Sequence, residues 1–224
     1  MPNLIPSTCV ISFDTTWFGK LGISVSRDII DKENLLWVFV EKEKQDPYDY
    51  MYNKIKEQGF TILGIVVDGR KSFYTSFNNT PIQMGHFHMA KILSRYLTKN
   101  PNLQVNIDLW NIWYKVNTLT PYQLNKELFN WYRIYAHKLV EEYIDPRDNR
   151  WRYTKERTLK AYHFIKRFVQ YLFTYRDSRW IPNTNISTEG MFSQMKRKIK
   201  IHNELILERK MKIIHYYLRK NGAK

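Results

Sequence analysis

Three acidic residues have the types and the places in the sequence that a two-metal phosphoryl-transfer site requires: Asp14, Asp68 and Glu189. Asp14 follows the run 9–13 and Asp68 follows the run 61–67. Both runs are apolar and rich in β-branched residues, which predicts buried strands. Glu189 follows Ser187, a residue type favoured as an N-cap, and precedes a long helical pattern. Two strand-borne aspartates and one helix-borne glutamate can therefore converge from distant parts of the chain.

Carboxylates that are held close together are ligands for hard divalent cations. Two such ions about 3.5–4 Å apart stabilise both the attacking and the leaving oxygen of a phosphodiester. Without metal, the carboxylates repel one another and at least one pKa rises. A structural reading stands beside this one for each aspartate alone, because an Asp at the end of a strand is usually a turn former or a helix cap.

The charge of the chain favours a polyanionic partner. Its 224 residues carry 36 Lys and Arg against 21 Asp and Glu, a formal net charge of +15. Residues 1–100 are nearly balanced, whereas residues 181–224 carry ten basic and three acidic side chains. This distribution indicates phosphate contacts in the C-terminal half. A solvated basic surface is the alternative.

The remaining composition excludes several classes of protein. The single cysteine, Cys9, excludes an internal disulfide framework and a cysteine-rich zinc site. The apolar content of 43% predicts a packed core, and no window approaches 18 uninterrupted apolar residues. We therefore expect a globular cytoplasmic protein, associated with the nucleoid through DNA and without a membrane partner.

Residues 8–88 have the pattern of an α/β unit. Strands are predicted over 9–13, 21–27, 35–40 and 61–67, with a fifth over 82–87, and a helix opens at Asp46-Pro47 and ends before Gly59. This order is that of a ribonuclease-H-like core, in which the first three strands are antiparallel and the fourth pairs parallel with the first. We expect a mixed five-stranded sheet with helices, formed by residues 1–97 and 181–224.

Residues 98–180 differ in character, because apolar and aromatic residues recur there at helical spacing. This spacing predicts an all-helical insertion that interrupts the core. Within it, residues 144–152 are the best candidate for a loop. Two further helices, over about 188–200 and 207–220, are expected to complete the core.

Four motifs, taken together and in order, resemble the catalytic domain of bacterial Mutator-like (MULE-type) transposases. They are FDTTWFG (13–19), VDGRK (67–71), PIQMGHFH (81–88), and IPNTN (181–185) with EGMFS (189–193). The family carries a DDE triad on a ribonuclease-H-like fold, and the resemblance covers nearly the whole chain. It implies that Asp14, Asp68 and Glu189 bind two Mg²⁺ or Mn²⁺ ions. It also implies transposon ends and target DNA as partners, bound by a homo-oligomer.

The chain departs from the family pattern in two places. Members often carry a Cys where this chain has Gly85, which leaves His88 of that motif. On an extended strand His86 and His88 would share a side, suited to joint metal ligation or contact with a nucleotide, although hydrogen-bonded structural histidines are the alternative. Members also usually begin with a DNA-recognition module, whereas this chain begins about thirteen residues before Asp14. We expect either a fragment of a longer transposase or recognition by another polypeptide.

Candidate DNA contacts lie near the acids and in two polar segments. Lys196 shares a helical face with Glu189, and Arg197 and Lys198 extend that basic surface. A solvated lysine on an amphipathic helix is the alternative. The other candidates are Arg70 and Lys71, which follow Asp68, and Trp151 and Trp180, whose loop-like contexts suit stacking on bases.

The sequence thus predicts a metal-dependent transposase of a transposable element, acting in DNA recombination. Metal-activated water would cut the phosphodiester at a transposon end, and the freed 3′-hydroxyl would attack target DNA. The alternative is a catalytically inactive remnant that only binds DNA or assembles with it, which the Gly85 departure and the expected lack of a recognition module motivate. A related nuclease or resolvase is a third possibility.

Overall fold

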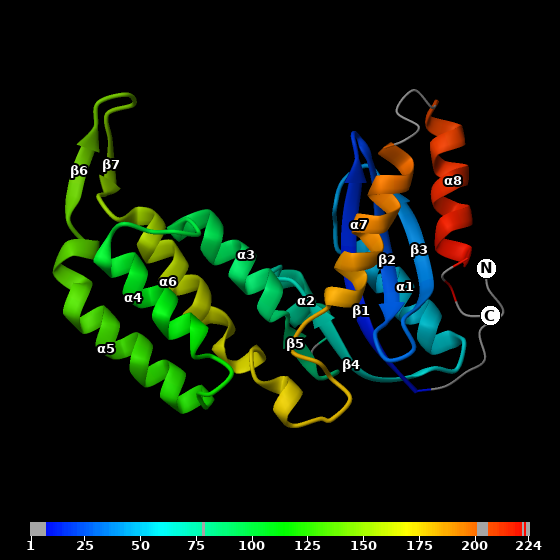
Figure 1. Cartoon of the computed structure of the whole chain (residues 1–224), viewed down its shortest axis with the longest axis horizontal. Coiled ribbons are helices and arrows are strands. Elements are labelled where there is room, and N and C mark those ends of the chain that lie inside the picture. Colours follow the sequence, from blue (N-terminus) through cyan, green and yellow to red (C-terminus); the bar gives the residue numbers. More distant parts are fainter. Residues whose placement is uncertain (1–7, 78, 201–205, 221, 223–224) are drawn as a thin grey trace. The chain divides into compact units, whose positions relative to one another are not determined.

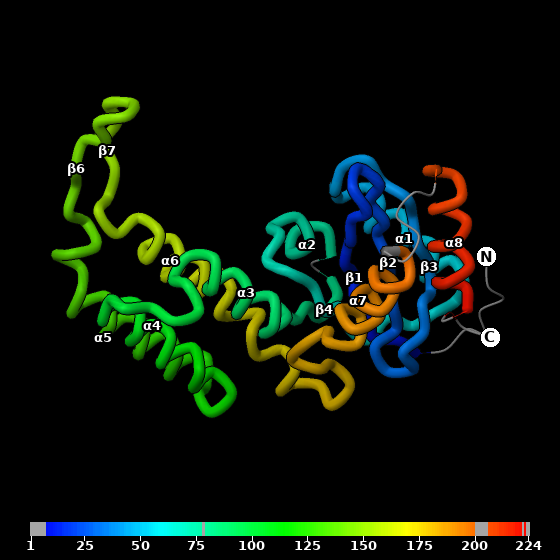
Figure 2. Tube along the Cα trace, turned by 45° about the horizontal axis from the view of Figure 1, so that its top comes forward, coloured from blue at the N-terminus to red at the C-terminus, as the bar shows by residue number. Residues whose placement is uncertain are grey.

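The computed structural model describes residues 8–77, 79–200, 206–220 and 222, which form two compact units. The first unit is made of the chain up to Gly85 and from Thr174 onward, and the second is His86–Phe173. The first contains a β-sheet and the second is mainly helical (Figure 1 and Figure 2). None of the described helices combines the length and the apolar character of a membrane span.

The first unit is built around a mixed sheet with the strand order β3-β2-β1-β4-β5. β1 pairs antiparallel with β2, and β2 with β3, whereas β1–β4 and β4–β5 are parallel. The prediction of an α/β protein with a mixed five-stranded sheet is therefore confirmed. The strands are β1 (Thr8–Phe18), β2 (Leu21–Asp28), β3 (Glu33–Val40), β4 (Thr61–Val67) and β5 (Ile82–Met84).

One face of this sheet is covered by α1 (Asp46–Glu57) and α2 (Lys71–Ser76) through an aromatic cluster. The ring of Phe13 lies 5.6 Å from Tyr48, 6.3 Å from Phe73 and 5.5 Å from Phe77. Successive side chains of a strand point to opposite faces. Because Phe13 is buried on this face, its neighbour Asp14 points to the other.

The opposite face is covered by α7 (Ile186–Lys200) and α8 (Leu207–Lys220), which lie beside the strands in Figure 1. Both helices bury apolar side chains against Ile23 and Val25 of β2. The buried members from the helices are Met191, Phe192, Met195, Ile199, Ile214, Tyr217 and Leu218. Packing of this cluster holds α7 on the face to which Asp14 points.

The segment that leads into α7 lies directly on the sheet at Gly64. An added Cβ at Gly64 would lie 2.3 Å from Cδ1 of Ile181 and 3.2 Å from the carbonyl oxygen of Pro81. The absence of a side chain there allows Ile181 to pack against Val10 and Val66 in a small buried cluster. Gly64 therefore determines how closely the approach to α7 follows the sheet.

The second unit contains four helices that pack against one another: α3 (His86–Leu97), α4 (Gln104–Tyr114), α5 (Pro121–Leu139) and α6 (Glu156–Phe168). The buried Trp131 of α5 stacks on Tyr162 of α6 with a ring separation of 5.4 Å. α5 begins with a capping box, in which Thr120 and Gln123 satisfy each other's backbone N–H groups. The 3₁₀ turns Val169–Tyr171 and Thr174–Arg176 follow α6.

The prediction of an all-helical insertion is wrong between residues 142 and 153. A two-stranded antiparallel hairpin forms there from β6 (Glu142–Asp145) and β7 (Arg150–Tyr153), and it is separate from the five-stranded sheet. The buried Asp145 forms ion pairs with Arg147 at 2.7 Å and with Arg152 at 3.0 Å. These ion pairs connect the two strands and the turn between them. The spacing of apolar residues in the sequence carries no information about such pairs. The predicted domain boundaries at 97/98 and 180/181 remain a prediction. The division of the chain into two compact units does not show whether one of them is an insertion into the other.

Three predicted element boundaries are also corrected. β1 continues to Phe18 instead of ending at residue 13, because its antiparallel pairing with β2 extends that far. The fifth strand ends at Met84, and α3 begins at His86. α7 begins at Ile186, so Ser187 lies inside the helix and is not its N-cap.

We predict that Gly64→Ala destabilises the first unit by about 2 kcal/mol, because the new methyl group overlaps Ile181 and lies tightly against the carbonyl oxygen of Pro81. Gly190→Ala on α7 is the matched control, since a Cβ there meets no atom within 4 Å. This control is expected to be neutral or to stabilise by up to about 1 kcal/mol, because Ala is the better helix former. Urea unfolding measures both, and equal effects would contradict the packing argument.

Candidate metal centre

The parallel register of β1 and β4 places Asp14 and Asp68 on one face of the sheet. Ser12 pairs with Val66; Asp14 lies two residues further along β1, and Asp68 lies two residues further along the chain, just past the end of β4. Because side chains alternate between faces, Ser12 and Asp14 share a face, and so do Val66 and Asp68. The parallel pairing ends near this point, where β4 stops at Val67 while β1 continues along β2.

Glu189 reaches this face from α7, of which it is the fourth residue. A carboxylate oxygen of Glu189 lies within 4.8 Å of one from Asp14. One helical turn earlier, the amide of Asn185 donates to the hydroxyl of Ser12 at 3.4 Å. Asn185 contacts Ser12, and Glu189 approaches Asp14, which lies two residues further along β1. The packing of residues 185–189 against β1 therefore positions the third carboxylate.

Backbone groups fix the orientation of both aspartates. Asp14 Oδ1 accepts the N–H of Thr15 at 2.8 Å, and Asp68 Oδ1 accepts the N–H of Arg70 at 2.9 Å. Each carboxylate is therefore held by the residue or turn that follows it. Neither bond uses the second oxygen of its carboxylate.

Burial is the main cause that raises the pKa of Asp14 well above its usual range. The negative charges of Glu189 and then of Asp68 raise it further, Glu43 adds a smaller effect, and the hydrogen bond from Thr15 opposes the shift. Asp14, with the negative charges of Glu189 and Asp68 acting on it, is part of a donor set that fits hard divalent cations, because a cation relieves this repulsion. Their role as metal ligands remains a prediction.

A chain of polar contacts connects the two aspartate-bearing strands. The hydroxyls of Thr15 and Tyr48 lie 2.5 Å apart, and Tyr48 donates to Glu43 at 2.8 Å. Glu43 forms an ion pair with Arg70, whose guanidinium lies 5.7 Å from the ring centre of Tyr48. The residue after Asp14 is thus linked to the turn that holds Asp68. The sequence predicted the helix that carries Tyr48 but gave no indication of Glu43, whose partners are determined by tertiary contacts alone.

The predicted DNA contacts beside Asp68 differ in their surroundings. Arg70 is half-buried and engaged by Glu43, so its side chain already supports the first unit. Lys71 is exposed at the first residue of α2. Contact of either residue with DNA remains a prediction.

Three basic residues of α7 that were singled out as DNA contacts, Lys196, Arg197 and Lys198, are exposed. Lys196 lies two helical turns after Glu189, on the same face. Arg197 is also exposed, and the ammonium of Lys198 lies 5.0 Å from the ring centre of Tyr217. Their contact with phosphates remains a prediction.

The two tryptophans singled out for stacking are both accessible. Trp151 is 69% exposed, but it belongs to β7 and not to a loop. Trp180 is 46% exposed, and the guanidinium of Arg179 lies 4.5 Å from its ring centre. Stacking of either ring on a base remains a prediction.

The two histidines do not share a side of a strand, because both lie in the first turn of α3, where residues two apart diverge. Both are buried members of the second unit. The Nε2 atom of His86 lies 2.8 Å from the carbonyl oxygen of Leu172, and its ring meets Trp113 edge-on. His86 thus has structural contacts, and an accessory role for His86 or His88 remains a prediction.

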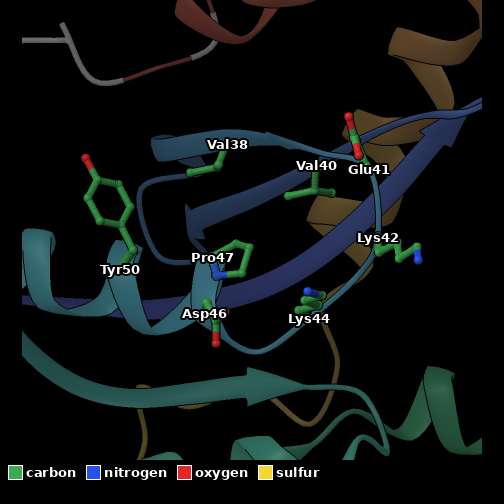
Figure 3. Close-up of a pocket in the computed structure, with 8 residues that line it drawn as sticks. All are labelled: Val38, Val40, Glu41, Lys42, Lys44, Asp46, Pro47 and Tyr50. Atoms are coloured by element: carbon green, nitrogen blue, oxygen red, sulfur yellow. The ribbon is translucent and has the colours of Figure 1, made fainter.

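A hollow of about 570 Å³ lies elsewhere in the first unit, between the end of β3 and the start of α1 (Figure 3). None of the three acids lines it. Its charged lining is balanced, with Glu41 and Asp46 beside Lys42 and Lys44. This balance selects no class of charged ligand, so the carboxylate group is the better candidate site.

We predict that Asp14→Asn stabilises the metal-free protein at neutral pH, on the order of 1 kcal/mol. The folded-state pKa of Asp14 lies above its unfolded value, so the native state loses stability as pH rises through that interval. The variant removes this loss while Asn can still accept the Thr15 N–H. Urea unfolding at several pH values measures the gain, which should disappear at acid pH. A gain independent of pH, or one equalled by the exposed Asp31→Asn, would contradict the assignment.

Comparison with known proteins adds no assignment to this geometry: neither the family models nor the curated proteins searched contain a match to the chain.

Proposed function

We propose that this chain is the catalytic domain of a DDE transposase with a ribonuclease-H-like core, which cuts DNA strands and transfers them to a target. The observation that carries the proposal is the approach of a Glu189 carboxylate oxygen to within 4.8 Å of one from Asp14, with the negative charges of Glu189 and Asp68 both raising the pKa of Asp14. The strand order and the parallel pairing of β1 with β4 support the fold. The resemblance of the four motifs supports the family.

The donor set fits two divalent cations, Mg²⁺ or Mn²⁺, which Asp14, Asp68 and Glu189 would hold. When bound, such ions activate water and stabilise the charge of the attacking and leaving oxygens. The chain contributes orientation: the N–H groups of Thr15 and Arg70 hold two of the carboxylates in place. The same three acids would serve both strand cleavage and strand transfer.

We propose that the positively charged side chains of α7 bind DNA. Lys196 lies on the face of Glu189, where it can bind a phosphate of the strand being cut. Its neighbours Arg197 and Lys198 are exposed and can follow the backbone without reading sequence. The expected partners are transposon ends and target DNA, bound by a homo-oligomer.

We predict that Asp68→Asn abolishes Mg²⁺- or Mn²⁺-dependent strand cleavage. The reduction should exceed the ~100-fold typical of an outer-sphere partner, because a direct ligand is removed. DNA affinity should persist, since no basic side chain changes, and Asn can still accept the Arg70 N–H. Cleavage of supplied element ends by the full-length protein measures the effect.

The matched control is Asp46→Asn, in the exposed first turn of α1, which should cut as the wild type does. Cleavage by Asp68→Asn at the wild-type rate would overturn the enzyme assignment. A wild type that binds DNA but never cuts pre-nicked ends with Mn²⁺ present would favour the inactive remnant.

A second variant separates binding from chemistry. Replacing Lys196, Arg197 and Lys198 together by Ala should weaken DNA binding and reduce the log–log salt slope. The reduction should be roughly 0.9 for each phosphate that the protein no longer neutralises. Fluorescence anisotropy over a range of salt concentrations measures both quantities.

The control for this variant removes the same number of charges on and just before α1, at Lys42, Lys54 and Lys56. It should leave the salt slope close to the wild-type value. Equal reductions in the two triple variants would mean that net charge, and not the α7 surface, determines binding.

A further inference from the structure

A row of polar side chains runs through the first unit from β2 to the turn after β4. The hydroxyl oxygens of Ser24 and Thr15 lie 2.6 Å apart, and those of Thr15 and Tyr48 lie 2.5 Å apart. Tyr48 donates to a carboxylate oxygen of Glu43 at 2.8 Å, and the same oxygen forms the ion pair with Arg70. We call these five residues the polar chain, and all of them belong to the first unit.

The hydroxyl protons of the polar chain have one direction that satisfies all of its members. A hydroxyl group donates once, and a carboxylate only accepts. Because Tyr48 donates to Glu43, its oxygen accepts the proton of Thr15, and the oxygen of Thr15 accepts that of Ser24. Burial raises the pKa of Tyr48, which keeps this phenol protonated at neutral pH. The hydrogen bonds therefore all point toward the carboxylate that Arg70 neutralises.

Two members of the polar chain also hold the candidate metal ligands through their backbone. The N–H of Thr15 donates to Asp14 at 2.8 Å, and the N–H of Arg70 donates to Asp68 at 2.9 Å. A displacement of either side chain therefore moves an N–H group that orients an aspartate. Outer-sphere groups of this kind orient metal ligands and set the affinity for the metal.

The side chain of Arg70 is fixed by several contacts within the first unit. Besides its ion pair with Glu43, it donates to the backbone carbonyl of the same residue at 3.2 Å. Its guanidinium lies 5.7 Å from the ring centre of Tyr48 and 5.8 Å from that of Phe73. Contacts of this number fit a residue that holds the turn after β4 in place.

We infer that Glu43, Tyr48 and Arg70 are positioning residues of the three-carboxylate site. Together they fix the orientation of the two aspartates, which raises the affinity of the site for divalent cations. The part that concerns cations rests on the proposed function, whereas the positioning of the aspartates rests on the contacts of the polar chain.

The variant Tyr48→Phe tests this inference in the full chain. It removes the central hydroxyl and keeps the ring that packs against Phe13 and Phe73. The affinity for Mn²⁺ should fall about tenfold, at the lower end of the effect of removing an outer-sphere partner. Isothermal titration calorimetry with MnCl₂ alone measures this change.

Tyr52→Phe is the matched control. Tyr52 lies one turn further along α1, and its hydroxyl also bonds a threonine hydroxyl, that of Thr80, at 2.7 Å. It is not a member of the polar chain. The control should therefore lose a similar amount of folding stability, measured by urea unfolding, and bind Mn²⁺ as the wild type does.

Hydrogen exchange of the metal-free proteins tests the positioning without any ion. The amide of Arg70 should exchange faster in Tyr48→Phe, because its bond to Asp68 loosens, and at the wild-type rate in Tyr52→Phe. Equal changes in the two variants, or an unchanged Mn²⁺ affinity of Tyr48→Phe, would overturn the inference. The expected loss of affinity in a protein that never cuts DNA would keep the positioning role and contradict the proposed function. A wild type that binds no Mn²⁺ would overturn both.

Discussion

The first unit is organised around an unfavourable interaction: like charges are held together on a half-buried face. Asp14 and Glu189 approach within 4.8 Å, and Asp68 adds to the repulsion that, after burial, raises the pKa of Asp14. Such an arrangement costs stability in the absence of a counter-charge. The arrangement persists because contacts of the surrounding structure stabilise it by more than the charge repulsion destabilises it. A bound cation would replace this repulsion by attraction, which is the role we propose for the arrangement.

That surrounding structure has two parts, one on each face of the sheet. On the α7 face, close packing at Gly64 and the Asn185–Ser12 contact guide the chain into α7, so that its fourth residue meets Asp14. Polar contacts from Thr15 through Tyr48 and Glu43 to Arg70 connect the two aspartate-bearing strands from the α1 side. Apolar packing together with the Asn185–Ser12 hydrogen bond therefore positions the glutamate, and hydrogen bonds position the aspartates.

The sequence predicts those parts of the fold that depend on local pattern. β4 and α8 have the predicted bounds, because continuous apolar runs and helical spacing are local signals. The extension of β1 to Phe18 depends on its pairing with β2, and the β6–β7 hairpin depends on ion pairs of Asp145, so neither was found. Within the site, residue type indicated the three acids. Glu43 was missed because only tertiary contacts show what it faces.

Anomalous diffraction from crystals soaked in Mn²⁺ shows whether Asp14, Asp68 and Glu189 hold divalent cations. We expect anomalous density within ~2.5 Å of carboxylate oxygens from all three residues. The density should be lost in crystals of Asp68→Asn. Absence of density at these carboxylates in the wild type, in crystals where Mn²⁺ binds elsewhere on the chain, would rule out the proposed metal centre.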